Sequence, residues 1–324
     1  KIAVFSGDKL VRVPQGTVGG DYLYTQLHPT QSWGKEFVVI PTQDHDISYM
    51  RVTSLFDSCS IFCNGAFQTT INQYQTFEMQ LTQTTVVTTT MPVEVVNCMP
   101  SRTCSAPDCY WGDAAFTTIT PVEQASNRGV FFTYPFSSRA GNAPIFYLDV
   151  AVPVADSSSL ILDGDSLSGF SVVQSYAVKR MQIAAGTHTL SASDSSYFVA
   201  TTSGVDENWG GYLYSINGNC NSILDMSEVL AVTSASLSAV DNDTIRICSN
   251  GMLALSVASG TIWDSVWWEF DGDTIIVGDS IEYAIPSAGS HYVVVYALPA
   301  YPFSAMCGVV SQRYVVETSP ADTI

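Results

Sequence analysis

Apolar and polar positions alternate with a period of two along most of the chain. Short runs that are rich in β-branched and aromatic residues, such as 37–40, 85–88 and 292–296, are typical of strands. Between the runs lie dipeptides that favour hairpin turns, namely Asn64-Gly65, Asp163-Gly164, Asn217-Gly218, Asn250-Gly251 and Asp271-Gly272. This pattern predicts an all-β chain.

An internal duplication is visible within this pattern. Residues 74–81 and 176–183 share Tyr, Met and Gln at matching positions and end in Leu and Ile. Upstream of these segments, Asn64-Gly65 corresponds to Asp163-Gly164 in the same order. The spacing of about 100 residues is the size of one β-sandwich.

Beyond these repeats the sequence changes character. Trp263, Trp267 and Trp268 cluster between Cys248 and Cys307, which is an immunoglobulin-like arrangement of aromatic residues and cysteines. Adjacent residues of a strand point to opposite faces, so at least one of Trp267 and Trp268 should be buried.

Together these signals predict tandem β-sandwich domains. Residues 1–111 and 112–216 should form two related copies that pack against each other through a shared apolar face. Residues 237–318 should form an Ig-like sandwich, with 217–236 as a linker and 319–324 as a tail.

The composition narrows the range of partners. Hydrophobic residues make up 46% of the chain and charged residues only 13%, and 12 Lys and Arg face 30 Asp and Glu, for a net charge of −18. Such a surface repels phosphate backbones and anionic lipids, which argues against nucleic-acid partners. No run reaches the roughly 18 apolar residues that cross a bilayer, so we expect no membrane insertion.

Eight cysteines in a lysine-poor chain indicate an exported protein with disulfide bonds. The candidate pairs are Cys59–Cys63 and Cys248–Cys307. A zinc site is the alternative, but the repeated C-x2-C spacing that zinc sites favour is absent. The chain begins without Met or a signal-peptide pattern, which indicates a processed or excerpted polypeptide. Asn242 lies in a glycosylation sequon.

Motifs for catalysis are missing from the sequence. No G-x-S-x-G pentapeptide, P-loop or dinucleotide fingerprint occurs, so we predict no enzyme, no catalytic residue and no cofactor. Calcium is the candidate ion, because Asp163 with Asp165 and Asp271 with Asp273 supply oxygens in turns. The alternative is that Asx-Gly turns need these acids for their backbone conformation alone.

Aromatic residues offer one candidate ligand site. Trp209, Tyr212 and Tyr214 follow one another at a glycine-rich junction, where they could stack on a sugar or could close the second sandwich. The first six residues resemble the last strand of each copy. They could pair with the edge of another subunit and form filaments, or could close a sheet within their own chain.

Residues 1–216 resemble the N-terminal domain family of IgGFc-binding proteins. The opening IAVFSGDKLVRVP, the following DYLYTQLHPTQSWGKEFVVIP, TPVEQ at 120–124 and ILDG at 161–164 carry the resemblance. The chain departs from that family in its cysteine-dense CMPSRTCSAPDC loop and in a shortened glycine-rich end. The resemblance implies a secreted protein with an adhesive, scaffold or binding role, and it transfers no binding residue.

The last part of the chain, with NDTIRIC, VWWEFDGD and SHYVVVYA, resembles PKD-like and Ig-like modules of secreted Bacteroidota surface proteins. In such modules the VWWEFDGD stretch is a strand and a turn. The combined expectation is a secreted or cell-surface, non-enzymatic structural protein that adheres through β-sandwich surfaces and could assemble with copies of itself. The alternative is a carbohydrate- or glycoprotein-binding module.

Overall fold

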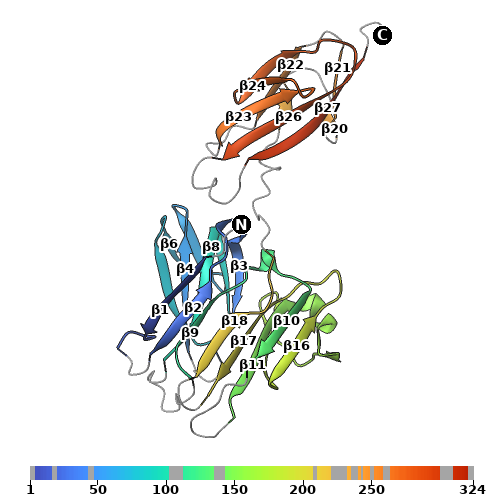
Figure 1. Ribbon diagram of the computed structural model, residues 1–324. Coiled ribbons are helices and arrows are strands. Elements are labelled where there is room, and N and C mark those ends of the chain that lie inside the picture. The colour runs from blue at the N-terminus through green and yellow to red at the C-terminus, as the bar shows by residue number, and fades with distance from the viewer. Residues whose placement is uncertain are drawn as a thin grey trace. The chain divides into compact units, whose positions relative to one another are not determined.

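The computed structural model describes residues 4–16, 20–42, 47–101, 112–134, 143–206, 210–219, 232–234, 240–241, 244–248, 252–257, 263–299 and 309–319. Almost all regular structure in these ranges is β, which confirms the predicted class of tandem β-sandwiches (Figure 1). The chain divides into two compact units, Lys1–Ile223 and Leu224–Ile324. We call them the N-terminal unit and the C-terminal unit.

The first copy within the N-terminal unit is one sandwich built around a single long strand. Its strands are β3 (Gly34–Val39), β4 (Ser48–Ser54), β5 (Cys59–Cys63), β6 (Ala66–Ile71), β7 (Thr76–Leu81), β8 (Thr85–Met99) and β9 (Ala115–Thr118). The first half of β8 pairs with β3 and β5, and its second half pairs with β4 and β9. The two halves of β8 therefore pair with different strands.

The second copy repeats this pairing. Its strands are β10 (Arg128–Thr133), β11 (Ile145–Pro153), β12 (Ile161–Leu162), β13 (Asp165–Ser166), β14 (Ser171–Val173), β15 (Tyr176–Ile183), β16 (Gly186–Ser191), β17 (Val199–Val205) and β18 (Gly211–Ser215). The sheets are β10-β16-β12-β13 and β14-β15-β11-β17-β18, so β16 and β17 correspond to the two halves of β8. The repeated segments 74–81 and 176–183 contain strands in both copies, β7 beside β4 and β15 beside β11.

Short 3-10 helices accompany the strands, and two of them lie at equivalent places in the two copies. Helix η1 (Thr30–Ser32) precedes β3, η2 (Val122–Gln124) precedes β10, and η3 (Val154–Ser159) follows β11. The correspondence of η1 and η2 extends the repeat upstream of the sheets.

The two copies pack against each other, as the sequence predicts. Each copy has its own core, and a further cluster joins Val38 and Ile40 of β3 and its end to Ala151, Val178 and Val199 of the second copy. Strand β9 lies beyond residue 111 but pairs with β8 of the first copy. The unit is thus held together both by a shared apolar face and by an exchange of chain at the boundary.

The C-terminal unit is a separate sandwich. Its strands are β19 (Val232–Ser234), β20 (Val240–Asp241), β21 (Thr244–Cys248), β22 (Met252–Val257), β23 (Trp263–Phe270), β24 (Thr274–Val277), β25 (Ser280–Ala284), β26 (Gly289–Pro299) and β27 (Val310–Ser319). They form the sheets β19-β22-β25 and β20-β21-β27-β26-β23-β24. Trp268 is fully buried in the core, and Trp267 stacks on Tyr296 on the opposite face, which confirms the prediction for this pair.

Candidate binding site

Strands β1 (Phe5–Val11) and β2 (Asp21–Gln26) form a two-stranded sheet that displays aromatic residues. Tyr22 and Tyr24 are 75% and 70% exposed, and the ring of Tyr24 stacks on that of Phe5 with centroids 5.3 Å apart. Opposite Tyr24 stands Gly7, where a Cβ atom would collide with the carbonyl oxygen of Leu23. Glycine therefore allows the two strands to approach closely. We call this sheet the aromatic ribbon.

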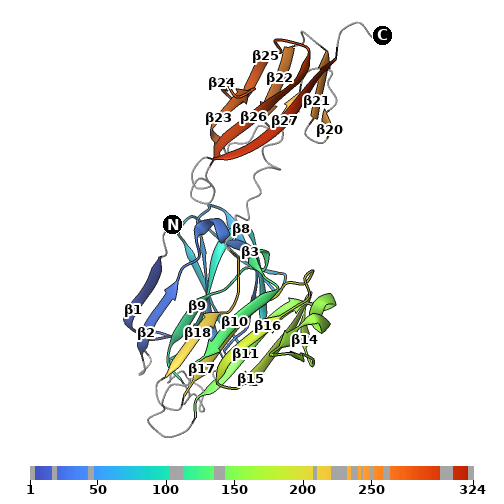
Figure 2. The same ribbon diagram turned by 45° about the vertical axis from the view of Figure 1, so that its right-hand side comes forward.

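The ribbon docks on the first copy by its other face. Leu23 is buried, and Figures 1 and 2 show β2 lying beside β9. The main chains of Val13 and Ser101 are hydrogen bonded with an N–O distance of 2.6 Å. The N-terminal strand thus pairs within its own chain, and β1 has no second partner strand among the described residues.

A groove of about 760 Å³ lies between the ribbon and strands β9, β18 and β10. Its volume is within the range of ligand pockets, roughly 300–1,000 Å³. The lining residues that matter for its chemistry are Phe5, Tyr24, Gln26, His28, Arg128 and Tyr214. Figure 2 shows β2, β9, β18 and β10 in succession across this side of the unit. We call it the ribbon groove.

Tyr214 ties the two sheets of the second copy together at the edge of the groove. Its hydroxyl donates to the Phe132 carbonyl at 2.6 Å and accepts from the Phe132 N–H at 3.0 Å. Burial raises the pKa of Tyr214. Tyr212 stacks between Tyr214 and Phe146, and Trp209 lies outside the described residues. Of the three predicted aromatic ligands, Tyr212 and Tyr214 thus have contacts that close the sandwich.

His28 and Glu94 form a polar pair beside the groove. Glu94 is buried, and its Oε1 lies 3.3 Å from Nδ1 of His28. Burial raises the pKa of Glu94, and the nearby His28 opposes this effect. Nε2 of His28 lies 3.5 Å from the Thr118 hydroxyl. His28 therefore connects a buried carboxylate to the groove lining.

The charge distribution in the groove is opposite to that of the chain as a whole. Among the described residues that line the groove there is no aspartate or glutamate, while Arg128 and His28 both lie there. Arg128 is exposed and forms no ion pair with a described residue, although Asp194 lines an adjoining hollow together with it. The described lining of the groove thus contains no acidic side chain, in a chain with a net charge of −18.

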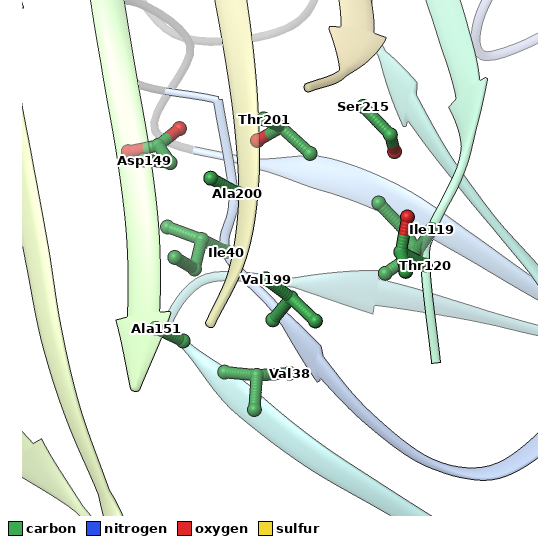
Figure 3. A pocket seen from close by; sticks show the side chains of 10 residues that line it. All are labelled: Val38, Ile40, Ile119, Thr120, Asp149, Ala151, Val199, Ala200, Thr201 and Ser215. Carbon is green, nitrogen blue, oxygen red and sulfur yellow. The ribbon is translucent and has the colours of Figure 1, made fainter. Parts of the chain in front are cut away.

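A second, much smaller cavity lies where the two copies meet (Figure 3). It has a volume of about 10 Å³ and is lined by Val38, Ile40 and Val199, with Asp149 at one side. Nε of Arg180 lies 3.0 Å from Asp149 Oδ1, and burial raises the pKa of Asp149 to about 7 although Arg180 opposes this. A cavity of this size holds one water molecule at most, so it is a feature of the core.

In the C-terminal unit, the calcium candidate Asp271 lies in a hairpin turn. Its Oδ1 accepts the Tyr292 N–H at 2.9 Å and its Oδ2 lies 2.7 Å from Nδ1 of His291. Nε2 of His291 lies 3.1 Å from the Ser287 carbonyl. Because both nitrogens face acceptors, this arrangement favours the doubly protonated, positively charged ring. We call this arrangement the His–Asp clasp.

The N-terminal unit contains the same clasp. Asp163 accepts the Thr189 N–H at 2.7 Å and lies 2.6 Å from Nδ1 of His188. In the first copy, Asn64 occupies the turn position that corresponds to Asp163, and its side-chain oxygen accepts the Val86 N–H at 2.9 Å. Asn64, Asp163 and Asp271 all have positive φ and precede glycine.

The predicted co-ligands Asp165 and Asp273 are exposed residues of the same turns. No group of three His, Cys, Asp or Glu that could hold a metal ion occurs in the ranges that the structure describes. Since His and main-chain donors occupy the Asp163 and Asp271 carboxylates, these residues act in the turns.

The clasp predicts a pH-dependent stability for the C-terminal unit. The hydrogen bond to Asp271 raises the pKa of His291, so the clasp stabilises fully below the ordinary histidine pKa and this contribution is lost as pH rises through the raised value. Asp271→Asn keeps the turn, as Asn64 does, but removes the charge. We expect it to cost about 1–2 kcal/mol near pH 5.5 and less near pH 8.5. Denaturant unfolding at both pH values measures this, and equal losses would contradict it.

The predicted disulfide Cys59–Cys63 does not form. Both cysteines are buried and free within the single strand β5. Four residues of extended strand separate their Cα atoms by about 13 Å, far beyond the roughly 7 Å limit of a disulfide. Cys98 is also free, and its burial raises the pKa of its thiol to about 11. Cys307, the side chain of Cys248 and the sequon residue Asn242 lie outside the described part of the chain.

A family model described as IgGFc binding protein matches residues 1–204. No curated protein matches the chain. A solved structure of the apo form of a Pleurotus ostreatus lectin is 12% identical and covers 60% of this chain and 81% of its own, with a TM-score of 0.14, which is too low to support an argument. Among the described residues, no helix is long and apolar enough to cross a membrane.

Proposed function

The chain belongs to the IgGFc binding protein family, and from this membership we propose that it is an exported, non-enzymatic protein that binds protein or glycan surfaces outside the cell. The observation that carries the proposal is the aromatic ribbon, because Phe5, Tyr22 and Tyr24 leave large apolar faces in water. Exposed aromatic groups of this kind are typical of interaction sites. A structural role at a cell surface, with adhesion through the sandwich faces and assembly of copies into filaments or a surface layer, is the finer form of this proposal.

The test is binding of the full chain to immobilised extracellular glycoproteins, native and enzymatically deglycosylated. We expect saturable binding that weakens when aromatic residues of the ribbon are replaced, since these rings supply apolar contact area. Retained binding after deglycosylation identifies a protein surface as the target, and loss identifies glycans. Absence of saturable binding to every surface would contradict the proposal. Particle sizing of the same preparation tests self-assembly, which predicts species larger than one chain.

A further inference from the structure

We propose that the ribbon groove binds an oligosaccharide that ends in a carboxylate-bearing sugar. This inference rests on the proposed role of the chain as an extracellular binding protein and names the ligand class of one site. Three features of the groove support it: an exposed aromatic wall, a lining of uncharged polar groups, and a cation that forms no ion pair with a described residue.

The rings of the aromatic wall stack on each other. Phe5 and Tyr24 are stacked with an angle of 3° between their planes, and 50% and 70% of their surfaces are exposed. Sugar rings carry an apolar face of C–H groups, which packs on the flat face of an aromatic ring. Rings held in place by each other lose little conformational entropy when a ligand arrives, so the stack favours binding.

The lining supplies neutral hydrogen-bonding groups. Gln26 is exposed, and its side-chain amide has no hydrogen bond to a described residue, so it can both donate to and accept from a sugar hydroxyl. By contrast, Asn217 and Ser215 also line the groove but bond to main-chain atoms of their own unit. These two residues shape the floor, and Gln26 on the ribbon side and Arg128 on the opposite side remain for a ligand.

The charge pattern favours one negative group on that ligand. The guanidinium of Arg128 presents a planar fork of N–H donors that fits a carboxylate with two parallel hydrogen bonds. No acidic side chain of the described lining competes for it, and His28 adds a second nitrogen that can donate. We therefore expect a sugar with a carboxylate to bind in the groove more tightly than an uncharged sugar.

The net charge of the chain limits how many negative groups the ligand can carry. At −18 the surface as a whole repels a polymer with many negative groups. A single carboxylate at the end of an otherwise neutral oligosaccharide avoids this repulsion, because the neutral sugars lie on the aromatic wall and the acid lies at Arg128. We therefore assign the groove a terminal acidic sugar and not a polyanion.

The experiment measures binding of the full chain to four soluble probes by calorimetry. The probes are 3′-sialyllactose, its carboxyl methyl ester, lactose, and a disaccharide that ends in glucuronate. We expect the acidic probes to bind at least about tenfold more tightly than the ester and lactose, with an affinity that falls as salt rises. The comparison of sialic and glucuronic acid identifies which source of the carboxylate the groove accepts.

Two variants and two matched controls locate the site. Arg128→Gln should remove the preference for the acid, and Tyr24→Ala should weaken all sugar probes by about tenfold. Lys9→Gln makes the same change in net charge as Arg128→Gln, and Tyr197→Ala removes an exposed tyrosine that lies outside the ribbon. Neither control residue lines the groove, so both controls should bind like the parent chain.

The possible outcomes distinguish failure of this inference from failure of the proposed function. Equal affinity for sialyllactose and its ester, or an acid preference that survives Arg128→Gln, would overturn the acidic ligand. Binding to a glycoprotein surface with no affinity for any probe would overturn the groove assignment but retain the proposed function. Failure to bind both glycoproteins and probes would reject the two together.

Discussion

Replacement of Arg180 by leucine should lower the free energy of unfolding of the N-terminal unit by about 3–5 kcal/mol above neutral pH. Arg180 is the ion-pair partner of Asp149, whose side chain is only 3% exposed. A buried charge that loses its partner keeps the full cost of its removal from water. The loss should therefore be much larger than the value of an ordinary surface ion pair.

The pH dependence of this loss distinguishes the lost charge partner from lost packing. Burial raises the pKa of Asp149 to about 7 despite Arg180, so the folded chain keeps this proton where the unfolded chain has released it. The stability that the folded chain gains by keeping Asp149 protonated is fully present below the ordinary aspartate pKa. This contribution declines as pH rises to about 7. Without Arg180 the pKa should rise further. The destabilisation should thus be largest near pH 9 and shrink near pH 5.5.

The first copy provides a matched control. Arg51 pairs with Glu78 at the equivalent cross-strand position with the charges reversed, and both side chains are at least half exposed. Arg51→Leu should cost less than about 1 kcal/mol at either pH. Chemical denaturation of the two variants checks the prediction. Equal losses at both sites, or a loss at Arg180 that does not change with pH, would show that burial of Asp149 has no such effect.

The repeated pairs and turns show which parts of this fold the sequence predicts. Local signals were sufficient where the structure depends on neighbouring residues: period-two runs became strands, and Asn64, Asp163 and Asp271 lie in positive-φ turns as predicted. Asn217-Gly218 was predicted as a hairpin turn, but Asn217 is a buried residue whose amide bonds to Ser126 and Phe198. A turn signal cannot tell a solvated turn from a buried amide with distant partners.

The groove could not be predicted because it joins distant segments. Tyr24, Arg128 and Tyr214 come from three different strands, and the order of strands across sheets decides that they meet. One local signal was present: in Tyr22-Leu23-Tyr24 the leucine points to one face of the strand and both tyrosines to the other. That alternation predicts an exposed aromatic face on the ribbon, although it gives no information on Arg128.

Trp268→Ala should destabilise the C-terminal unit by about 3–5 kcal/mol and leave the N-terminal unit unchanged. Trp268 has no exposed surface, fills the core of its unit, and donates from Nε1 to the Gly278 carbonyl at 2.8 Å. Truncation leaves a large cavity and removes that hydrogen bond. All residues of this core cluster belong to the C-terminal unit, so only one of the thermal transitions should move to lower temperature.

Trp267→Ala is the control, because it removes the same side chain from the next position in β23. Trp267 is partly exposed and stacks on Tyr296 with centroids 5.5 Å apart, so its loss should cost only about 1–2 kcal/mol. Calorimetry with both variants, together with sugar binding, checks the prediction. Because the ribbon groove lies wholly in the N-terminal unit, Trp268→Ala should retain the parent affinity. A loss of affinity, or a shift of both transitions, would show that the two units do not fold independently.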